Sequence, residues 1–103
     1  MLSKFLRAFG TKSTGEGLER KIFYTDKRGK IISPWHDIDL YNENSVLLNT
    51  FIEIPKNTVP KFEVNLEAEF NPIIQDTKTN KETGEKVLRD YCMPTTFNYG
   101  CFP

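Results

Sequence analysis

The feature that most constrains the fold is a series of short β-type segments separated by turn signals. Residues 61–66 alternate polar and apolar side chains without a break, the pattern of a strand with one buried face. Residues 21–32 hold two β-type runs on either side of Asp26-Lys27-Arg28-Gly29, which predicts a hairpin. Because no helical pattern longer than two turns follows residue 20, we expect a mainly β chain, either a small barrel or a sandwich.

The remaining segments are shorter and less regular. We expect a loose N-terminal lead-in at residues 10–17 and an irregular corner at residues 33–37. A strand at residues 47–54 and a proline-bounded loop at residues 55–60 follow. A hairpin tip at residues 78–86 and a returning strand at residues 87–93 come last. The predicted organisation is therefore a flexible or targeting segment over residues 1–20 and one β domain over residues 21–103.

The charge and the apolar content exclude several classes of partner. Fourteen basic and fourteen acidic residues give no net charge, whereas a nucleic-acid-binding domain usually has a basic excess. The longest apolar runs have about four residues, far fewer than a membrane-spanning helix needs. We therefore expect neither a nucleic acid nor a membrane as partner.

Residues that commonly bind zinc or form disulfides are few. Cys92, Cys101 and His36 are too few for a structural zinc site, which normally has four such ligands. Two cysteines also make no disulfide framework, so we expect two reduced thiols.

The N-terminus allows two interpretations. Residues 1–10 contain Lys4 and Arg7 but no acidic residue, and the first acidic residue is Glu16. This composition is compatible with a mitochondrial transit peptide, and the alternative is a frayed basic N-terminus.

Charged residues around the proline-bounded loop form a candidate site. Glu53 ends one predicted strand, while Lys61 and Glu63 lie two apart on the polar face of the next strand. If these strands pair antiparallel, two carboxylates and an ammonium share one patch. Carboxylates are ligands of Mg²⁺, and lysine binds phosphoryl oxygens. Arg89 could add a bidentate phosphate contact and Tyr99 a hydroxyl donor; the alternative is an ordinary solvated strand face.

Several segments, in order and at similar spacing, resemble the eukaryotic-type soluble inorganic pyrophosphatases of family I over about residues 21–103. They are Ile32-Ser33-Pro34-Trp35-His36-Asp37-Ile38 with Leu40-Tyr41, Ile52-Glu53-Ile54-Pro55, Lys61-Phe62-Glu63-Val64, Phe70-Asn71-Pro72-Ile73-Ile74-Gln75-Asp76-Thr77, Asn98-Tyr99-Gly100 and Phe102-Pro103.

The resemblance implies a role for each candidate. Glu53 and Glu63 correspond to acidic residues at the metal site, Lys61 and Arg89 to phosphate-binding residues, and Tyr99 to an active-site tyrosine. The implied reaction is magnesium-dependent hydrolysis of inorganic pyrophosphate to two phosphates, in a barrel of OB-like form. Metal ions activate a water, and the cations neutralise the leaving phosphate. The corner that contains His36 is structural by the same resemblance.

The sequence departs from the family in three places. Thr95 stands where a tyrosine is expected, four residues before Tyr99. Lys56 and Asn57 replace an Arg-Trp pair, so the implied homodimer is expected to be weakened. The family's aspartate cluster would follow Pro103, so the chain is expected to carry a partial metal site and an incomplete barrel.

Two functional interpretations therefore stay open. The first is a pyrophosphatase, cytoplasmic or alternatively mitochondrial, represented here by its N-terminal part. The second is a non-catalytic product, either a truncated isoform, an inactive partner of a complete subunit or a binding module of OB-like form.

Overall fold

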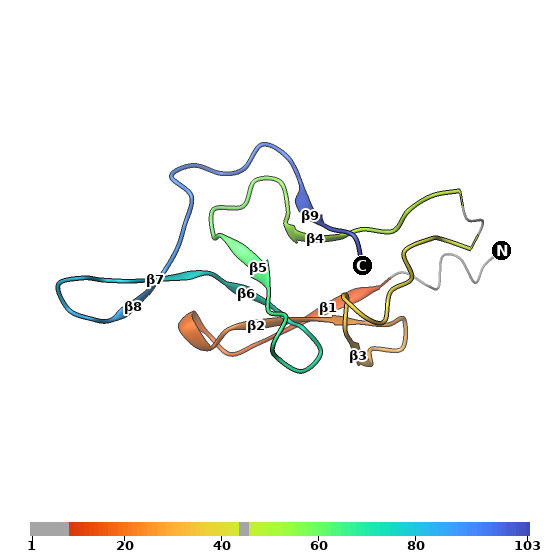
Figure 1. The fold of residues 1–103 in the computed structure, drawn as a ribbon, viewed down its shortest axis with the longest axis horizontal. Helices are drawn as coiled ribbons and strands as arrows, with labels where there is room; N and C mark the ends of the chain where they lie inside the picture. Colours follow the sequence, from red (N-terminus) through yellow and green to blue (C-terminus); the bar gives the residue numbers. More distant parts are fainter. Residues whose placement is uncertain (1–8, 44–45) are drawn as a thin grey trace.

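Nearly all regular structure in the described part of this protein is β-strand (Figure 1). The computed structural model describes residues 9–43 and 46–103, and within them the one helical element is the 3₁₀ turn η1 (Gly17–Glu19). No helix in this described part is long and apolar enough to cross a membrane. The strands are β1 (Gly10–Thr14), β2 (Lys21–Thr25), β3 (Ile31–Ile32), β4 (Phe51–Ile54), β5 (Phe62–Val64), β6 (Ile73–Gln75), β7 (Thr77–Thr79), β8 (Lys86–Leu88) and β9 (Tyr99–Cys101).

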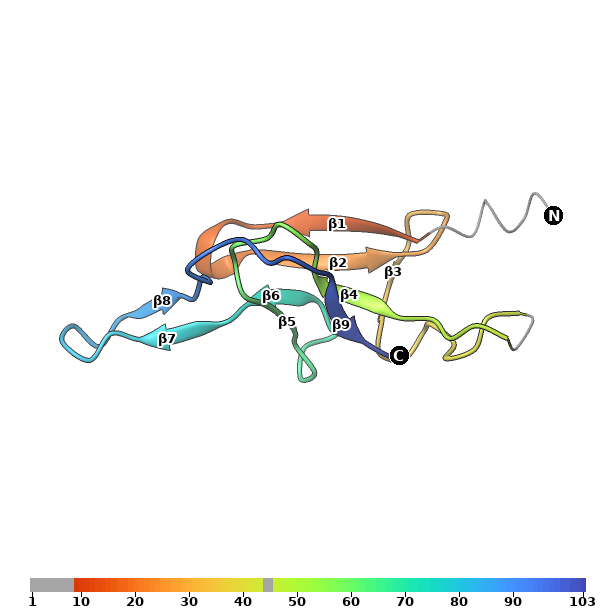
Figure 2. The ribbon, with the colours of Figure 1, turned by 90° about the horizontal axis from the view of Figure 1, so that it is seen from above.

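The strands form three antiparallel sheets. The largest has the order β1-β2-β6-β5, with β3 also paired to β2, while β4–β9 and β7–β8 are two-stranded. Figures 1 and 2 show β4–β9 lying over the largest sheet and β7–β8 projecting from one end of the molecule. No closed barrel forms among the described residues. The mainly β, incomplete-barrel fold that we predicted is thus confirmed.

The hairpin predicted for residues 21–32 is present as β2 and β3. One oxygen of Asp26 accepts the backbone N–H groups of Arg28 and Lys30, at 2.8 and 3.0 Å. Gly29 has φ +83°, a conformation that glycine adopts without a steric penalty. The turn residues therefore fix this hairpin locally.

Strand β1 was not predicted, because residues 10–17 were interpreted as a loose lead-in. The five residues of β1 pair antiparallel with β2, from Gly10 opposite Thr25 to Thr14 opposite Lys21. All five are exposed and mostly polar, so no hydrophobic alternation marks them. Residues 1–8, which carry the targeting-segment hypothesis, lie outside the described residues, and the division of the chain at residue 20 stays a prediction.

The core is small and lies between the largest sheet and the β4–β9 sheet that lies over it. Phe51 and Ile54 of β4 are almost fully buried, as is Ile73 of β6. The Tyr24 and Trp35 rings pack edge-on against Phe51, with centroid separations of 6.1 and 6.4 Å. The radius of gyration is 15.5 Å, against about 13 Å for a compact domain of this length. The chain is therefore extended, and it leaves many apolar side chains exposed.

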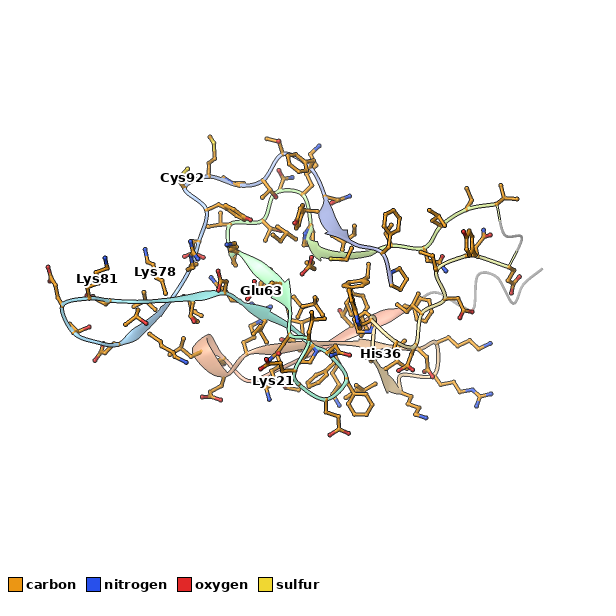
Figure 3. The ribbon with its side chains drawn as sticks, in the orientation of Figure 1. Lys21, His36, Glu63, Lys78, Lys81 and Cys92 are labelled. Carbon is orange, nitrogen blue, oxygen red and sulfur yellow. The ribbon has the colours of Figure 1, made fainter. Side chains whose placement is uncertain are left out.

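The corner at residues 33–37 is built around a buried serine. Ser33 Oγ accepts the backbone N–H groups of Trp35 and His36 and donates to Asn71 Oδ1 at 2.6 Å. Asp37 in turn accepts the N–H of Ser33 at 2.8 Å. His36 contributes its backbone here, and its side chain lies well away from Glu63 (Figure 3). These contacts are those of a structural corner.

Candidate active site

Three segments that are distant in sequence meet at Lys61, Asp76 and Arg89. Their backbones form a closed ring of hydrogen bonds. Asp76 N donates to Lys61 O at 2.8 Å, Lys61 N donates to Arg89 O at 3.0 Å, and Arg89 N donates to Asp76 O at 2.8 Å. This ring fixes the three Cα positions relative to one another, so the hairpin β7–β8 inserted between Asp76 and Arg89 does not displace either residue.

The side chains of these residues converge as well. Lys61 Nζ and Arg89 Nη1 contact the same oxygen of Asp76, Oδ2, at 3.2 and 3.0 Å. Two positive charges and one negative charge leave this cluster with a net charge of +1. The Arg89 side chain is 46% exposed and that of Lys61 is 35% exposed. Both cationic groups are therefore accessible to an anion in solution.

The carboxyl of Asp76 is held in its charged form. Desolvation raises its pKa, but the Lys61 hydrogen bond, the Thr77 N–H and the charges of Lys61 and Arg89 outweigh that effect, so the pKa is lowered. Our sequence interpretation did not select Asp76 as a site residue. It lay within a segment quoted for the resemblance, but its closeness to Lys61 and Arg89 depends on contacts between distant segments, which the sequence pattern did not show.

Glu63 lies on β5, two residues beyond Lys61, and is exposed. Together with Asp76 it lines a hollow of about 390 Å³. Arg20 and Lys21, beside η1, and Lys86 of β8 contribute basic side chains to the same hollow. Figure 3 shows Glu63 at the centre of the molecule. The structure therefore brings Lys61, Glu63 and Arg89 into one region around Asp76.

Glu53 occupies a different environment from the one we expected. The antiparallel pairing of β4 with β5 was wrong, because β4 pairs with β9 and β5 pairs with β6. Glu53 is 6% exposed. Its Oε2 accepts the backbone N–H of Val64 at 2.6 Å, and its Oε1 accepts a hydrogen bond from Cys101 Sγ at 3.1 Å. Glu53 thus reaches β5 through a side-chain contact next to Glu63.

The buried carboxylate of Glu53 affects its neighbours. Desolvation, together with the hydrogen bond and the negative charge of Glu53, raises the pKa of the Cys101 thiol to about 11. Desolvation likewise raises the pKa of Tyr24, whose hydroxyl donates to Ile52 O at 2.7 Å. Both groups therefore stay protonated at neutral pH.

Tyr99 begins β9, opposite Ile54 of β4, and its side chain is 56% exposed. The next residue, Gly100, packs so closely that a Cβ would lie 2.0 Å from Phe51 O. This close approach holds Tyr99 on the same two-stranded sheet as Glu53. In the described part of the chain, no recorded hydrogen bond or ion pair joins these two residues to the Lys61–Asp76–Arg89 cluster.

Thr95, which replaces the expected tyrosine, has a structural position. Its hydroxyl donates to Pro55 O at 3.1 Å and accepts the N–H of Thr58 at 3.2 Å. The backbone N–H groups of Lys56 and Asn57 donate to Asn98 Oδ1 and Thr95 O, at 2.7 and 2.8 Å. Thr95 therefore fastens the loop at residues 55–60 to the C-terminal segment.

The described residues suit a divalent metal in the type of ligand but not in number. Carboxylate oxygens such as those of Glu53 and Glu63 are the ligands that Mg²⁺ prefers, in a shell of about six oxygens. Over residues 9–43 and 46–103, no group of three histidine, cysteine, aspartate or glutamate side chains could hold a metal ion. Both oxygens of Glu53 also already accept hydrogen bonds. These residues therefore do not complete a metal centre.

Comparison with curated proteins identifies one group of relatives. The chain is 40% identical over 104 residues to an inorganic pyrophosphatase of Candida albicans, a match that covers 95% of this chain and 34% of that protein. It is 45% identical over 84 residues to an inorganic pyrophosphatase of Schizosaccharomyces pombe, covering 78% and 28%. The chain thus spans about a third of the length of its curated relatives. No protein-family model matches it.

Solved structures agree with the sequence relatives. The type I inorganic pyrophosphatase of Toxoplasma gondii superposes with a TM-score of 0.74 at 36% identity, over 93% of this chain and 42% of that one. A truncated vacuolar soluble pyrophosphatase of Trypanosoma cruzi, in complex with PPi, superposes with a TM-score of 0.67 at 36% identity, over 93% and 41%. The chain is therefore homologous to the N-terminal part of the type I inorganic pyrophosphatases.

Proposed function

We propose that this chain carries the phosphate-binding part of a magnesium-dependent pyrophosphatase site that hydrolyses inorganic pyrophosphate to two phosphates. The observation that carries the proposal is the convergence of Lys61 Nζ and Arg89 Nη1 on one oxygen of Asp76. Two cations held this close can bind oxygens of one phosphoryl group or of two adjacent ones. The relatives bear the name of the same activity.

Each residue then has a defined task. Arg89 offers a planar guanidinium that can donate two hydrogen bonds to a phosphoryl group, and Lys61 supplies a point charge. The ring of backbone hydrogen bonds positions both before substrate arrives, so less ordering is needed on binding. Tyr99, exposed on β9, can donate its hydroxyl to the substrate.

Magnesium is the metal that the proposed reaction requires. Glu53 and Glu63 would supply carboxylate oxygens to it, and further acidic residues would have to complete its ligand shell. We infer that pyrophosphate binding belongs to this chain, and that efficient turnover requires that additional set of carboxylates.

Calorimetric titration with pyrophosphate, with and without Mg²⁺, tests the binding part of the proposal. Each charge-assisted hydrogen bond contributes about 1.5–3 kcal/mol, so Lys61→Ala and Arg89→Ala should each weaken binding about 10- to 100-fold. Lys78→Ala is the matched control, because Lys78 is an exposed lysine on β7, in the hairpin that projects from one end of the molecule (Figure 1). Equal affinities in all three variants would rule out this site.

Release of phosphate from pyrophosphate tests the catalytic part. The expected result is turnover far below that of a complete relative such as the Candida albicans enzyme. Tight, steeply salt-dependent binding of single-stranded nucleic acid, without any pyrophosphate binding, would instead favour the binding-module interpretation.

We also propose that any homodimer of this chain is weak. Lys56 and Asn57 are exposed on the loop at residues 55–60, whose backbone is already bonded within the chain. Sedimentation at increasing concentration tests the dimer.

We propose that the chain is cytoplasmic, with a mitochondrial location as the alternative. Relatives named chloroplastic and vacuolar exist, so the compartment varies among them. Imaging of the tagged chain with and without residues 1–10 tests its location.

A further inference from the structure

Among the described residues, the thiol of Cys101 and the backbone N–H of Val64 donate to the buried carboxylate of Glu53. Cys101 is the last residue of β9, and β9 pairs with β4, the strand that carries Glu53. The Sγ–Oε1 distance is 3.1 Å. The other donor, the N–H of Val64 on β5, lies 2.6 Å from Oε2. The carboxylate therefore connects three strands, and each of its oxygens has a defined donor.

A carboxylate in this position needs such donors. At 6% exposure, Glu53 has lost most of its contact with water. An ionised group in that environment is stabilised by hydrogen bonds to its charged form. A thiol is a weak donor, but a hydrogen bond to an ionised acceptor is stronger than one between neutral groups. The Cys101 thiol can also fix the rotation of the carboxylate, because Val64 alone would hold a single oxygen.

We infer that Cys101 is a positioning residue, which fixes the orientation of the Glu53 carboxylate within the proposed site. The inference rests on the proposed function, since it gives Glu53 a task in that site. It assigns Cys101 a role different from that of Cys92, which is exposed at an outer bend of the chain (Figure 3). The role depends on the donated hydrogen bond, so a side chain with a hydroxyl can substitute and an apolar one cannot.

The first test reads the position of the carboxylate without any turnover. In the ¹⁵N-labelled chain, the amide proton of Val64 reports the hydrogen bond to Glu53. In Cys101→Val we expect this resonance to move upfield and its hydrogen exchange to accelerate about tenfold. Cys101→Ser should stay close to wild type, because serine keeps a donor. Cys92→Val should leave the Val64 amide unchanged. If Cys101→Val does not fold, Cys101→Ala carries the same comparison.

A purely packing role of Cys101 predicts the opposite result, with the Val64 amide of Cys101→Val closer to wild type than that of Cys101→Ser. Serine is smaller and more polar than cysteine, whereas valine is apolar, so packing alone would favour valine over serine at this position. A Val64 amide that is the same in Cys101→Ser and Cys101→Val would overturn the inference.

The second test reads the consequence for binding. In the presence of Mg²⁺, Cys101→Val should bind pyrophosphate about five- to tenfold more weakly than Cys101→Ser. Equal affinities of these two variants would also overturn the role. Two results would instead count against the proposed function: no pyrophosphate binding by the wild type, or a Glu53→Gln variant that binds like the wild type. In either case the Val64 amide would still decide whether Cys101 orients the carboxylate.

Discussion

Arg89 and Asp76 are joined twice, once through the backbone and once through their side chains. Arg89 N donates to Asp76 O at 2.8 Å, and Arg89 Nη1 contacts Asp76 Oδ2 at 3.0 Å. The hairpin β7–β8 lies between the two residues in sequence, so this double contact closes its base. The position of Arg89 beside Lys61 is therefore a property of the hairpin base rather than of the hairpin's length.

The charge of Asp76 should make a pH-dependent contribution to stability. Its pKa is lowered in the folded chain, so the contribution is fully present above the unfolded pKa, near 4, and is lost as pH falls through the folded pKa. Asp76→Asn should remove it. Because the Arg89 and Lys61 partners are partly exposed, we expect the loss at pH 7 to be at most about 1 kcal/mol.

Urea denaturation of wild type and Asp76→Asn at pH 7 and at pH 3 measures this difference. The gap between the two proteins should narrow at the lower pH. Asp39→Asn, at an exposed position, serves as the control. A gap that widens on acidification would contradict the assignment of the charged form.

Gly100→Ala should strongly destabilise the pairing of β4 with β9. An added Cβ would lie 2.0 Å from Phe51 O and 2.8 Å from Ile52 Cα, and both are backbone atoms that cannot rotate away. We expect a loss of about 3 kcal/mol or more, at the upper end of the overpacking range. Thermal or urea unfolding measures it.

Gly84→Ala provides the comparison for that substitution. Gly84 has φ +75° and no heavy atom within 4 Å of the added Cβ, so only backbone strain of about 1 kcal/mol is expected. If the two alanine variants are equally stable, the close contact at Gly100 is not limiting.

The buried bond between Ser33 and Asn71 should be important for the loop that precedes β6. Asn71 has φ +44°, and its side-chain amide donates to the carbonyls of Asn65, Leu66 and Ala68, at 3.2, 3.1 and 3.3 Å. We expect Asn71→Ala to lower the free energy of unfolding by about 3 kcal/mol and Ser33→Ala by about 1–2 kcal/mol, since serine loses fewer contacts.

Denaturant titration separates these two variants. Ser13→Ala is the matched control, because Ser13 is exposed on β1 and accepts one hydrogen bond, from Arg20. A Ser33→Ala variant as stable as Ser13→Ala would show that the corner does not depend on its buried hydroxyl.

Local patterns predicted those parts of the fold that local chemistry determines. The β2–β3 hairpin follows from Asp26 and Gly29, and the predicted tip at residues 78–86 contains the turn that joins β7 to β8, together with one end of each strand. The strand expected over residues 61–66 ends at Val64, although the polar–apolar alternation continues to Leu66. Asn65 Oδ1 accepts the N–H groups of Glu67 and Ala68, which turns the chain.

Contacts between distant segments could not be predicted in the same way. The strand expected over residues 47–54 is limited to β4, because Leu48 bridges back to Tyr41 and Asn49 Nδ2 donates to Asp39 O at 2.6 Å. The partner of β4 is a segment nearly fifty residues later, and nothing in the pattern of either strand specifies that choice. For the same reason the role of Asp76 became visible only from its contacts.

The ring of three backbone hydrogen bonds divides this region into a variable part, the β7–β8 hairpin, and a fixed part, the base of that hairpin. Since both ends of the hairpin are held to Lys61, we expect insertions and substitutions at the tip between Thr79 and Lys86 to leave Asp76 and Arg89 in place. The β7–β8 loop is thus a natural position for a reporter or an affinity tag. It is also a segment in which evolution can change length while leaving the neighbouring chemistry intact.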